Sequence, residues 1–143
     1  MRVPNDLQIL NVIYKDYSEA FAAFSRNAPD RESKLLVPID VEAVAGRLKV
    51  DPDIVFGRLY YHLENKYGYD RDNGSRVVFF TPRAGKDSNC VNFPLLSSVV
   101  ADLREQRWKF SAPMYVALVS LLVSFGSLAV LVLGTLPIAA ASR

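Results

Sequence analysis

The chain has little of the side-chain chemistry that catalysis and metal binding use. Its 143 residues include one cysteine, Cys90, and one histidine, His62. A single cysteine forms no internal disulfide, and this pair forms no metal cluster unless carboxylates supply the other ligands. The sequence also lacks a phosphate loop, G-x-G-x-x-G, H-E-x-x-H and G-x-S-x-G. We therefore expect a non-enzymatic protein with no cofactor and no metal site.

Charge is missing from residues 110–142, which contain no Asp, Glu, Lys, Arg or His. An α-helix rises about 1.5 Å per residue, so about 20 apolar residues cross the hydrocarbon layer of a bilayer. The run predicts one transmembrane helix over residues 113–137, in contact with membrane lipid, and a short tail over residues 138–143. Pro113 suits a first helical turn, and Pro137 suits the end.

The flanks of this run predict its orientation. Aromatic and basic residues precede it, whereas only Arg143 follows it. The positive-inside rule then places the N-terminal part in the cytoplasm. The predicted location is the cell membrane, inner or cytoplasmic, which the chain crosses once. Small residues inside the run permit close approach of a second helix, which predicts a homodimer. These residues are Ser120, Ser124 and Gly126.

Strong charge of one sign is absent from the rest of the chain. Residues 1–109 hold 16 of the 17 Lys and Arg and all 15 Asp and Glu, a balance of 16 − 15 = +1. That balance argues against bulk nucleic acid as a partner.

The first element predicted is a helix of about twenty residues from Asn5 or Asp6. Its apolar residues recur every three or four positions at Leu7, Leu10, Tyr14, Tyr17, Phe21 and Phe24.

Two short helices and a hairpin are predicted next. Residues 34–39 suit a small strand, and Asp40 and Asp51 are N-cap signals for helices over residues 41–48 and 54–65. Strands are predicted over residues 76–81 and 90–93, after a turn at residues 72–75 and around a polar loop at residues 83–89.

The two helices resemble the helix-turn-helix of winged-helix domains. The resemblance is carried by Val44, Ala45, Leu48, Val50, Val55, Leu59 and Leu63, and with the hairpin as the wing it covers residues 5–93. The family usually ends its first helix with glycine. Here Lys49 takes that place, and it must adopt a left-handed backbone or end the helix differently.

The predicted fold class is therefore mainly α with a small β-hairpin, an α+β winged helix, followed by one transmembrane helix. We expect a cytoplasmic domain over residues 1–94, and a juxtamembrane helix over residues 95–112 that leads to the span.

The resemblance implies DNA binding through the second helix of the motif. At about 100° per residue, however, that helix places Val55, Leu59, Leu63 and Lys66 inward, and its outward face has no Lys or Arg. Exposed aromatic residues commonly anchor protein contacts. We therefore predict a protein-interaction or scaffolding module, with Phe56, Tyr60, Tyr61 and Glu64 as the partner-binding residues.

The alternative is a membrane-tethered, DNA-binding transcription regulator. Residues 66–86 have five basic and two acidic residues, a local charge of +3. Such a cluster suits a phosphate backbone or anionic lipid headgroups, although a solvated hairpin rim explains it as well. The candidate contacts are Arg58, His62, Arg76, Arg83 and Lys86.

Overall fold

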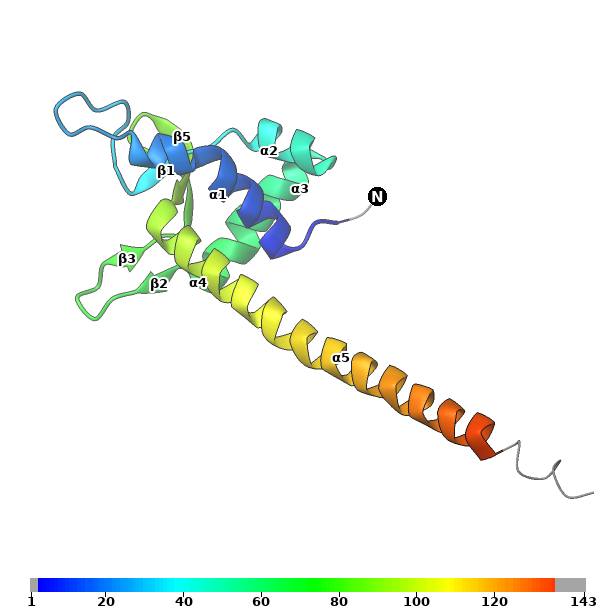
Figure 1. Cartoon of the computed structure of the whole chain (residues 1–143). Helices are drawn as coiled ribbons and strands as arrows, with labels where there is room; N and C mark the ends of the chain where they lie inside the picture. The colour runs from blue at the N-terminus through cyan, green and yellow to red at the C-terminus, as the bar shows by residue number, and fades with distance from the viewer. Residues whose placement is uncertain (1–2, 136–143) are drawn as a thin grey trace, which may run out of the picture. The chain divides into compact units, whose positions relative to one another are not determined.

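A computed structural model of the chain combines helices with short strands (Figure 1). The structure describes residues 3–135, except for the side chains of residues 110–114 and 132–135. Two units can be distinguished, Met1–Leu103 and Arg104–Arg143. The elements in order are α1 (Asp6–Ala22), β1 (Leu36–Pro38), α2 (Val41–Leu48), α3 (Pro52–Gly57), the π-helix η1 (Arg58–Leu63), α4 (Glu64–Tyr67), β2 (Tyr69–Asp70), β3 (Arg76–Val77), β4 (Phe80–Ala84), β5 (Asp87–Asn92) and α5 (Phe93–Thr135).

The predicted fold class is wrong, because the sheets are more extensive than one hairpin. A three-stranded antiparallel sheet has the order β1-β5-β4, and β2 and β3 form a separate two-stranded ribbon. The strand predicted over residues 76–81 is divided between the two. The interruption has a cause in Glu64, whose carboxylate accepts hydrogen bonds from the backbone N–H groups of Phe79 and Phe80.

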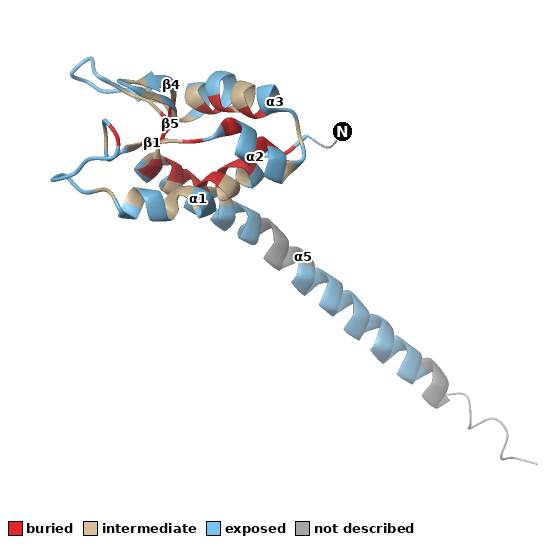
Figure 2. Ribbon diagram, turned by 90° about the horizontal axis from the view of Figure 1, so that it is seen from above, coloured by how far each residue is buried: buried red, intermediate tan, exposed pale blue. Residues whose placement is uncertain are grey.

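The transmembrane helix predicted over residues 113–137 is wrong as well. In the part of the chain that the structure describes, no helix combines the length and the apolar character that a membrane crossing requires. Helix α5 is continuous from Phe93 to Thr135. Where its side chains are described, residues 115–131 of this helix are exposed (Figure 2). Residues 136–137 and the predicted tail, 138–143, lie outside the described residues.

Helix α1 begins where its sequence predicts. Asn5 is the N-cap, and its side chain accepts a hydrogen bond from the backbone N–H of Gln8 while the Gln8 side chain accepts one from the backbone N–H of Asn5. This capping box satisfies two donors that the first helical turn leaves open. The inner face of the helix buries Ile9, Leu10 and Ile13.

The helix-turn-helix begins at α2, which Asp40 caps through a hydrogen bond from the Ala43 N–H to its carboxylate. Lys49 ends this helix in the left-handed conformation, at φ 56°. The N–H of Val50 then reaches the carbonyl of Ala45, a bond that satisfies one of the last carbonyls of the helix. Asp51 caps α3 in turn, so the sequence signals for both helix starts are confirmed.

A π-helical segment lies inside the second helix of the motif, where α3, η1 and α4 run on without a break. The inner residues Val55, Leu59 and Leu63 are fully buried and recur every four positions. In a regular α-helix such a row drifts by about 40° per step. The wider turns of η1 take up this drift, so the next inner residue is Tyr67, whose ring packs on Phe79 at 5.5 Å, and not Lys66 as the regular helix predicts.

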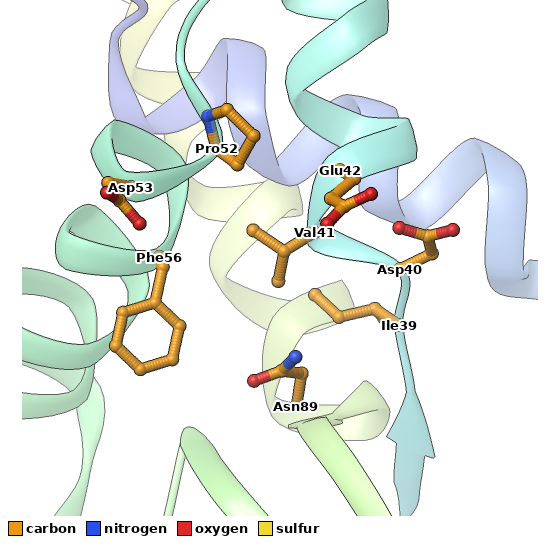
Figure 3. A pocket seen from close by; sticks show the side chains of 8 residues that line it. All are labelled: Ile39, Asp40, Val41, Glu42, Pro52, Asp53, Phe56 and Asn89. Atoms are coloured by element: carbon orange, nitrogen blue, oxygen red, sulfur yellow. The ribbon is translucent and has the colours of Figure 1, made fainter.

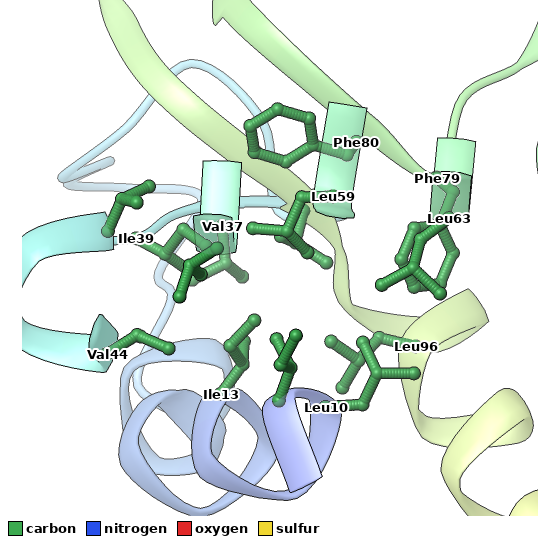
Figure 4. Close-up of a cluster of buried hydrophobic side chains, with 14 of the residues drawn as sticks. Leu10, Ile13, Val37, Ile39, Val44, Leu59, Leu63, Phe79, Phe80 and Leu96 are labelled. Carbon is green, nitrogen blue, oxygen red and sulfur yellow. The ribbon is translucent and has the colours of Figure 1, made fainter. Parts of the chain in front are cut away.

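The core lies between α1, the helix-turn-helix, the sheet and the first turns of α5. Figure 4 shows how its side chains meet, and Figure 2 shows the buried residues on the inner faces of α1, α2 and α3. Each fully buried apolar side chain contributes about 1.5–3 kcal/mol relative to exposure. The largest of them are Phe79, Phe80, Ile9, Leu10, Ile13, Leu59, Leu63 and Leu96.

Tyr17 on α1 also holds the start of α2. Its hydroxyl accepts a hydrogen bond of 2.7 Å from the backbone N–H of Asp40. We expect Tyr17→Phe to lower the free energy of unfolding by about 1 kcal/mol, because that N–H loses its partner while the ring remains packed. Urea denaturation measures the change. Tyr69→Phe, at an exposed position, is the control, and equal stabilities of the two variants would contradict the prediction.

Candidate functional site

An open groove of about 610 Å³ lies where η1 and α4 pass β4 and the residues before it. Polar and aromatic side chains line it in similar measure. We call it the aromatic groove, and its lining is Tyr60, Tyr61, Glu64, Asn65, Arg76, Val78, Phe80, Thr81 and Pro82. It contains three of the four residues predicted to bind a partner, and the fourth, Phe56, lies directly behind it.

Three aromatic rings form a continuous row beside this groove. Phe56 is half-buried and packs edge-on against Phe80, with ring centroids 5.8 Å apart. Tyr60 stacks on Phe56 at 5.6 Å, and Tyr61 meets Tyr60 edge-on at 4.9 Å and an interplanar angle of 78°. The row leads outward, since Tyr60 is 40% exposed and Tyr61 is 74% exposed. The structure thus places Tyr60 and Tyr61 outside, as the sequence predicts, with Phe56 as their support.

Glu64 has a structural role that the sequence did not reveal. One carboxylate oxygen, Oε2, accepts hydrogen bonds from the N–H groups of Phe79, at 2.6 Å, and Phe80, at 2.9 Å. The other, Oε1, accepts two from the guanidinium of Arg76, at 3.0 and 3.2 Å. A carboxylate has about four acceptor positions, so all of them are taken. Glu64 therefore joins the second motif helix to β4 and offers nothing further to a partner.

The basic side chains of the second motif helix turn toward α1. Arg58, His62 and Lys66 recur every four residues, and all three reach the carboxylate of Asp6, at 2.7, 3.3 and 3.3 Å. Burial raises the pKa of Asp6, but the hydrogen bonds from Arg58 and Lys66 and the positive charge around it outweigh burial and hold the pKa below its usual value. The residues predicted as candidate phosphate contacts on this helix, Arg58 and His62, are thus engaged within the domain.

The remaining candidate phosphate contacts do not form one surface with them. Arg76 bridges Glu64 and Asp70. Arg83 and Lys86 are exposed on the β4–β5 hairpin, and no ion pair to either occurs among the described residues. Two cations on one hairpin attract the phosphate backbone of DNA only weakly. The DNA-binding alternative stays a prediction that no contact in the described residues favours.

Proline at position 82 is a part of the groove that the sequence reasoning missed. Pro82 lies inside β4, on the outer edge of the sheet order β1-β5-β4, where a missing N–H costs no ladder hydrogen bond. The signal was present, because proline within a β-rich run marks an edge strand. The strand predicted over residues 76–81 stops before Pro82, whereas β4 continues through it to Ala84.

A second hollow, of about 260 Å³, lies between the starts of α2 and α3 (Figure 3). Asp53 and Phe56 border it on one side, and Asp40 and Glu42 on the other. Asp40 is already bound to a backbone N–H as the N-cap of α2. No group of His, Cys, Asp and Glu suited to a metal ion occurs among the residues that the structure describes. This acidic end of the motif repels a phosphate backbone.

Cys90 lies in β5 as a buried side chain. Burial, and then the nearby charge of Asp87, raises the pKa of its thiol above the ordinary value, which disfavours the reactive thiolate. His62 contacts Asp6 and does not pair with Cys90.

Comparison of the chain with protein-family models, with curated proteins and with solved structures gives no match.

Proposed function

We propose that the helix-turn-helix unit is a non-enzymatic protein-interaction module that docks its partner at the aromatic groove. The observation that carries the proposal is the pair Tyr60 and Tyr61, exposed side by side at the rim. Tyrosine is enriched at the energetic centres of protein interfaces, since its ring gives a large contact area for little side-chain entropy. The cations of the same helix are engaged with Asp6, which leaves the aromatic face as the accessible chemistry.

The order of the elements supports the winged-helix resemblance as part of this proposal. A helix and a strand precede the helix-turn-helix, and a β-hairpin follows it and pairs with that strand. In such an arrangement the second motif helix is the element that partners contact. Its described outer surface is aromatic rather than basic, which favours a protein over DNA.

Photo-crosslinking of the full chain in its host cells tests the proposal. A photo-reactive phenylalanine derivative replaces Tyr61 in one variant and Tyr69, an exposed tyrosine of β2 outside the groove, in the control. We expect discrete protein adducts from position 61 that position 69 does not give. Identical adduct patterns from the two positions would overturn the proposed function.

A further inference from the structure

We propose that the occupant of the aromatic groove is a proline-rich segment of a partner protein in the polyproline II conformation. This inference rests on the proposed function and names the chemistry of the partner. Its first support is the shape of the rim. Tyr60 and Tyr61 meet edge-on at 78°, which makes a corner with two aromatic walls. The compact pyrrolidine ring of proline packs well in such a corner. Aromatic-lined grooves are the usual binding sites for polyproline II segments.

The second support is that β4 does not accept an added strand. It lies at the outer edge of its sheet, where strand addition requires free backbone donors. Glu64 already takes the N–H groups of Phe79 and Phe80, and Pro82 has none. The hydroxyl of Thr81 also donates to the carbonyl of Arg83. A partner strand therefore finds no free backbone donor at Phe80 or Pro82, the part of β4 that lines the groove.

The third support is the match of donors and acceptors. The carboxylate of Glu64 has its acceptor positions filled by Arg76, Phe79 and Phe80. The hydroxyls of Tyr60 and Tyr61 and the side-chain amide of Asn65, by contrast, make no hydrogen bond within the described residues. They offer donors to the groove. A proline-rich segment has backbone carbonyls in excess of N–H groups, so it needs donors and few acceptors.

The mixed lining also distinguishes this occupant from an amphipathic helix. A helix binds through a continuous apolar groove that takes side chains from successive turns. Here Asn65, Arg76 and Thr81 interrupt the apolar lining. A polyproline II segment needs only the aromatic corner and a few donors, and it loses little conformational entropy on binding because it is extended beforehand.

Titration of the full chain with labelled peptides tests the inference. The probes are decaproline, a Gly-Ser decapeptide and a lysine-flanked Thr-Val decapeptide that forms strands, each followed by fluorescence anisotropy. We expect decaproline to bind at least tenfold more tightly than either of the others. Tyr61→Ala should weaken decaproline at least tenfold, and Tyr61→Phe less, because it retains the ring and loses the hydroxyl donor. Tyr69→Ala should leave affinity within twofold.

The outcomes separate the inference from the proposed function. Equal binding of decaproline and the Gly-Ser peptide, tighter binding of the Thr-Val peptide, or equal losses in Tyr61→Ala and Tyr69→Ala would each overturn the polyproline inference. If crosslinks specific to position 61 then persist, the groove still docks a protein and only the chemistry of the partner is wrong. Thermal unfolding of Tyr61→Ala checks that this exposed substitution leaves the fold intact.

Discussion

Replacement of Glu64 by alanine is expected to lower the free energy of unfolding by about 3–4 kcal/mol. Hydrogen bonds to a charged group contribute about 1.5–3 kcal/mol each, and a donor left without a partner adds its desolvation penalty. Glu64→Ala removes the acceptor of the Phe79 and Phe80 N–H groups, which both lie next to buried rings. It also leaves Arg76 without its shorter ion pair.

Urea denaturation of the purified full chain measures this effect. Glu19→Ala is the matched control, because Glu19 is an exposed helical glutamate without an ion pair among the described residues, and we expect a change within about 0.5 kcal/mol. Glu64→Gln should fall between the two, since an amide oxygen replaces only one of the two carboxylate oxygens. A loss below about 1 kcal/mol for Glu64→Ala would show that water replaces the carboxylate at β4.

The same contacts explain why the single strand predicted over residues 76–81 is divided between β3 and β4. Residues 76–81 are uniformly β-prone, so their composition gives one strand. The actual break after Val77 depends on a carboxylate twelve or more positions earlier, which reaches across from α4 to take two backbone donors. Pairing partners set by a distant side chain leave no local pattern in the sequence. The turn at residues 72–75 was local, and it is confirmed by the bond from the Gly74 N–H to the carbonyl of Arg71.

Helix starts were predictable for the opposite reason. Asn5, Asp40 and Asp51 each cap the helix that follows them through contacts within three residues. The inward row of Val55, Leu59 and Leu63 was also readable from spacing alone. The π-helical turns that keep this row aligned do not follow from the regular α-helical period. The regular period places Lys66 inward and Glu64 outward, and it therefore gives no sign of the bonds from Glu64 to the backbone before β4.

Of the groove lining, Tyr60, Tyr61 and Glu64 were predicted as partner-binding residues and Arg76 only as a phosphate or headgroup contact of the alternative, whereas the other lining residues were not predicted. Tyr60 and Tyr61 follow from the helical period together with the buried row. Arg76 comes from β3 and Pro82 from β4, and their contact with the tyrosines depends on tertiary packing. Burial of Arg31 is a comparable case, since its guanidinium binds the carbonyls of Ala20 and Ser33 and thereby ties the loop after α1 to that helix. Nothing near Arg31 in the sequence marks it as buried.

Substitution of Asp6 by asparagine is expected to lower the free energy of unfolding by about 2 kcal/mol at neutral pH, because its carboxylate is the shared partner of Arg58, His62 and Lys66. The amide keeps the shape and one acceptor, so the change isolates the charge. Asp53→Asn is the matched control. Asp53 also lies in the first turn of a helix and complements its dipole, but it is exposed and has no ion pair among the described residues. We expect its substitution to change stability by less than about 0.5 kcal/mol.

The contribution of Asp6 should also depend on pH in a defined direction. Because its pKa in the folded chain lies below the value of about 4 expected for the unfolded chain, the unfolded chain takes up the proton first as the solution is acidified. The contribution is therefore fully present above about pH 5 and is lost as pH falls through the folded pKa.

Urea unfolding of the native chain and of Asp6→Asn at pH 7, 5 and 2.5 measures this contribution. The difference between the two free energies of unfolding at each pH isolates it, because the effects of the other carboxylates cancel. That difference should be similar at pH 7 and 5 and smaller at pH 2.5. A difference that stays constant over the whole range would mean that Arg58 and Lys66 do not stabilise the ionised form of Asp6.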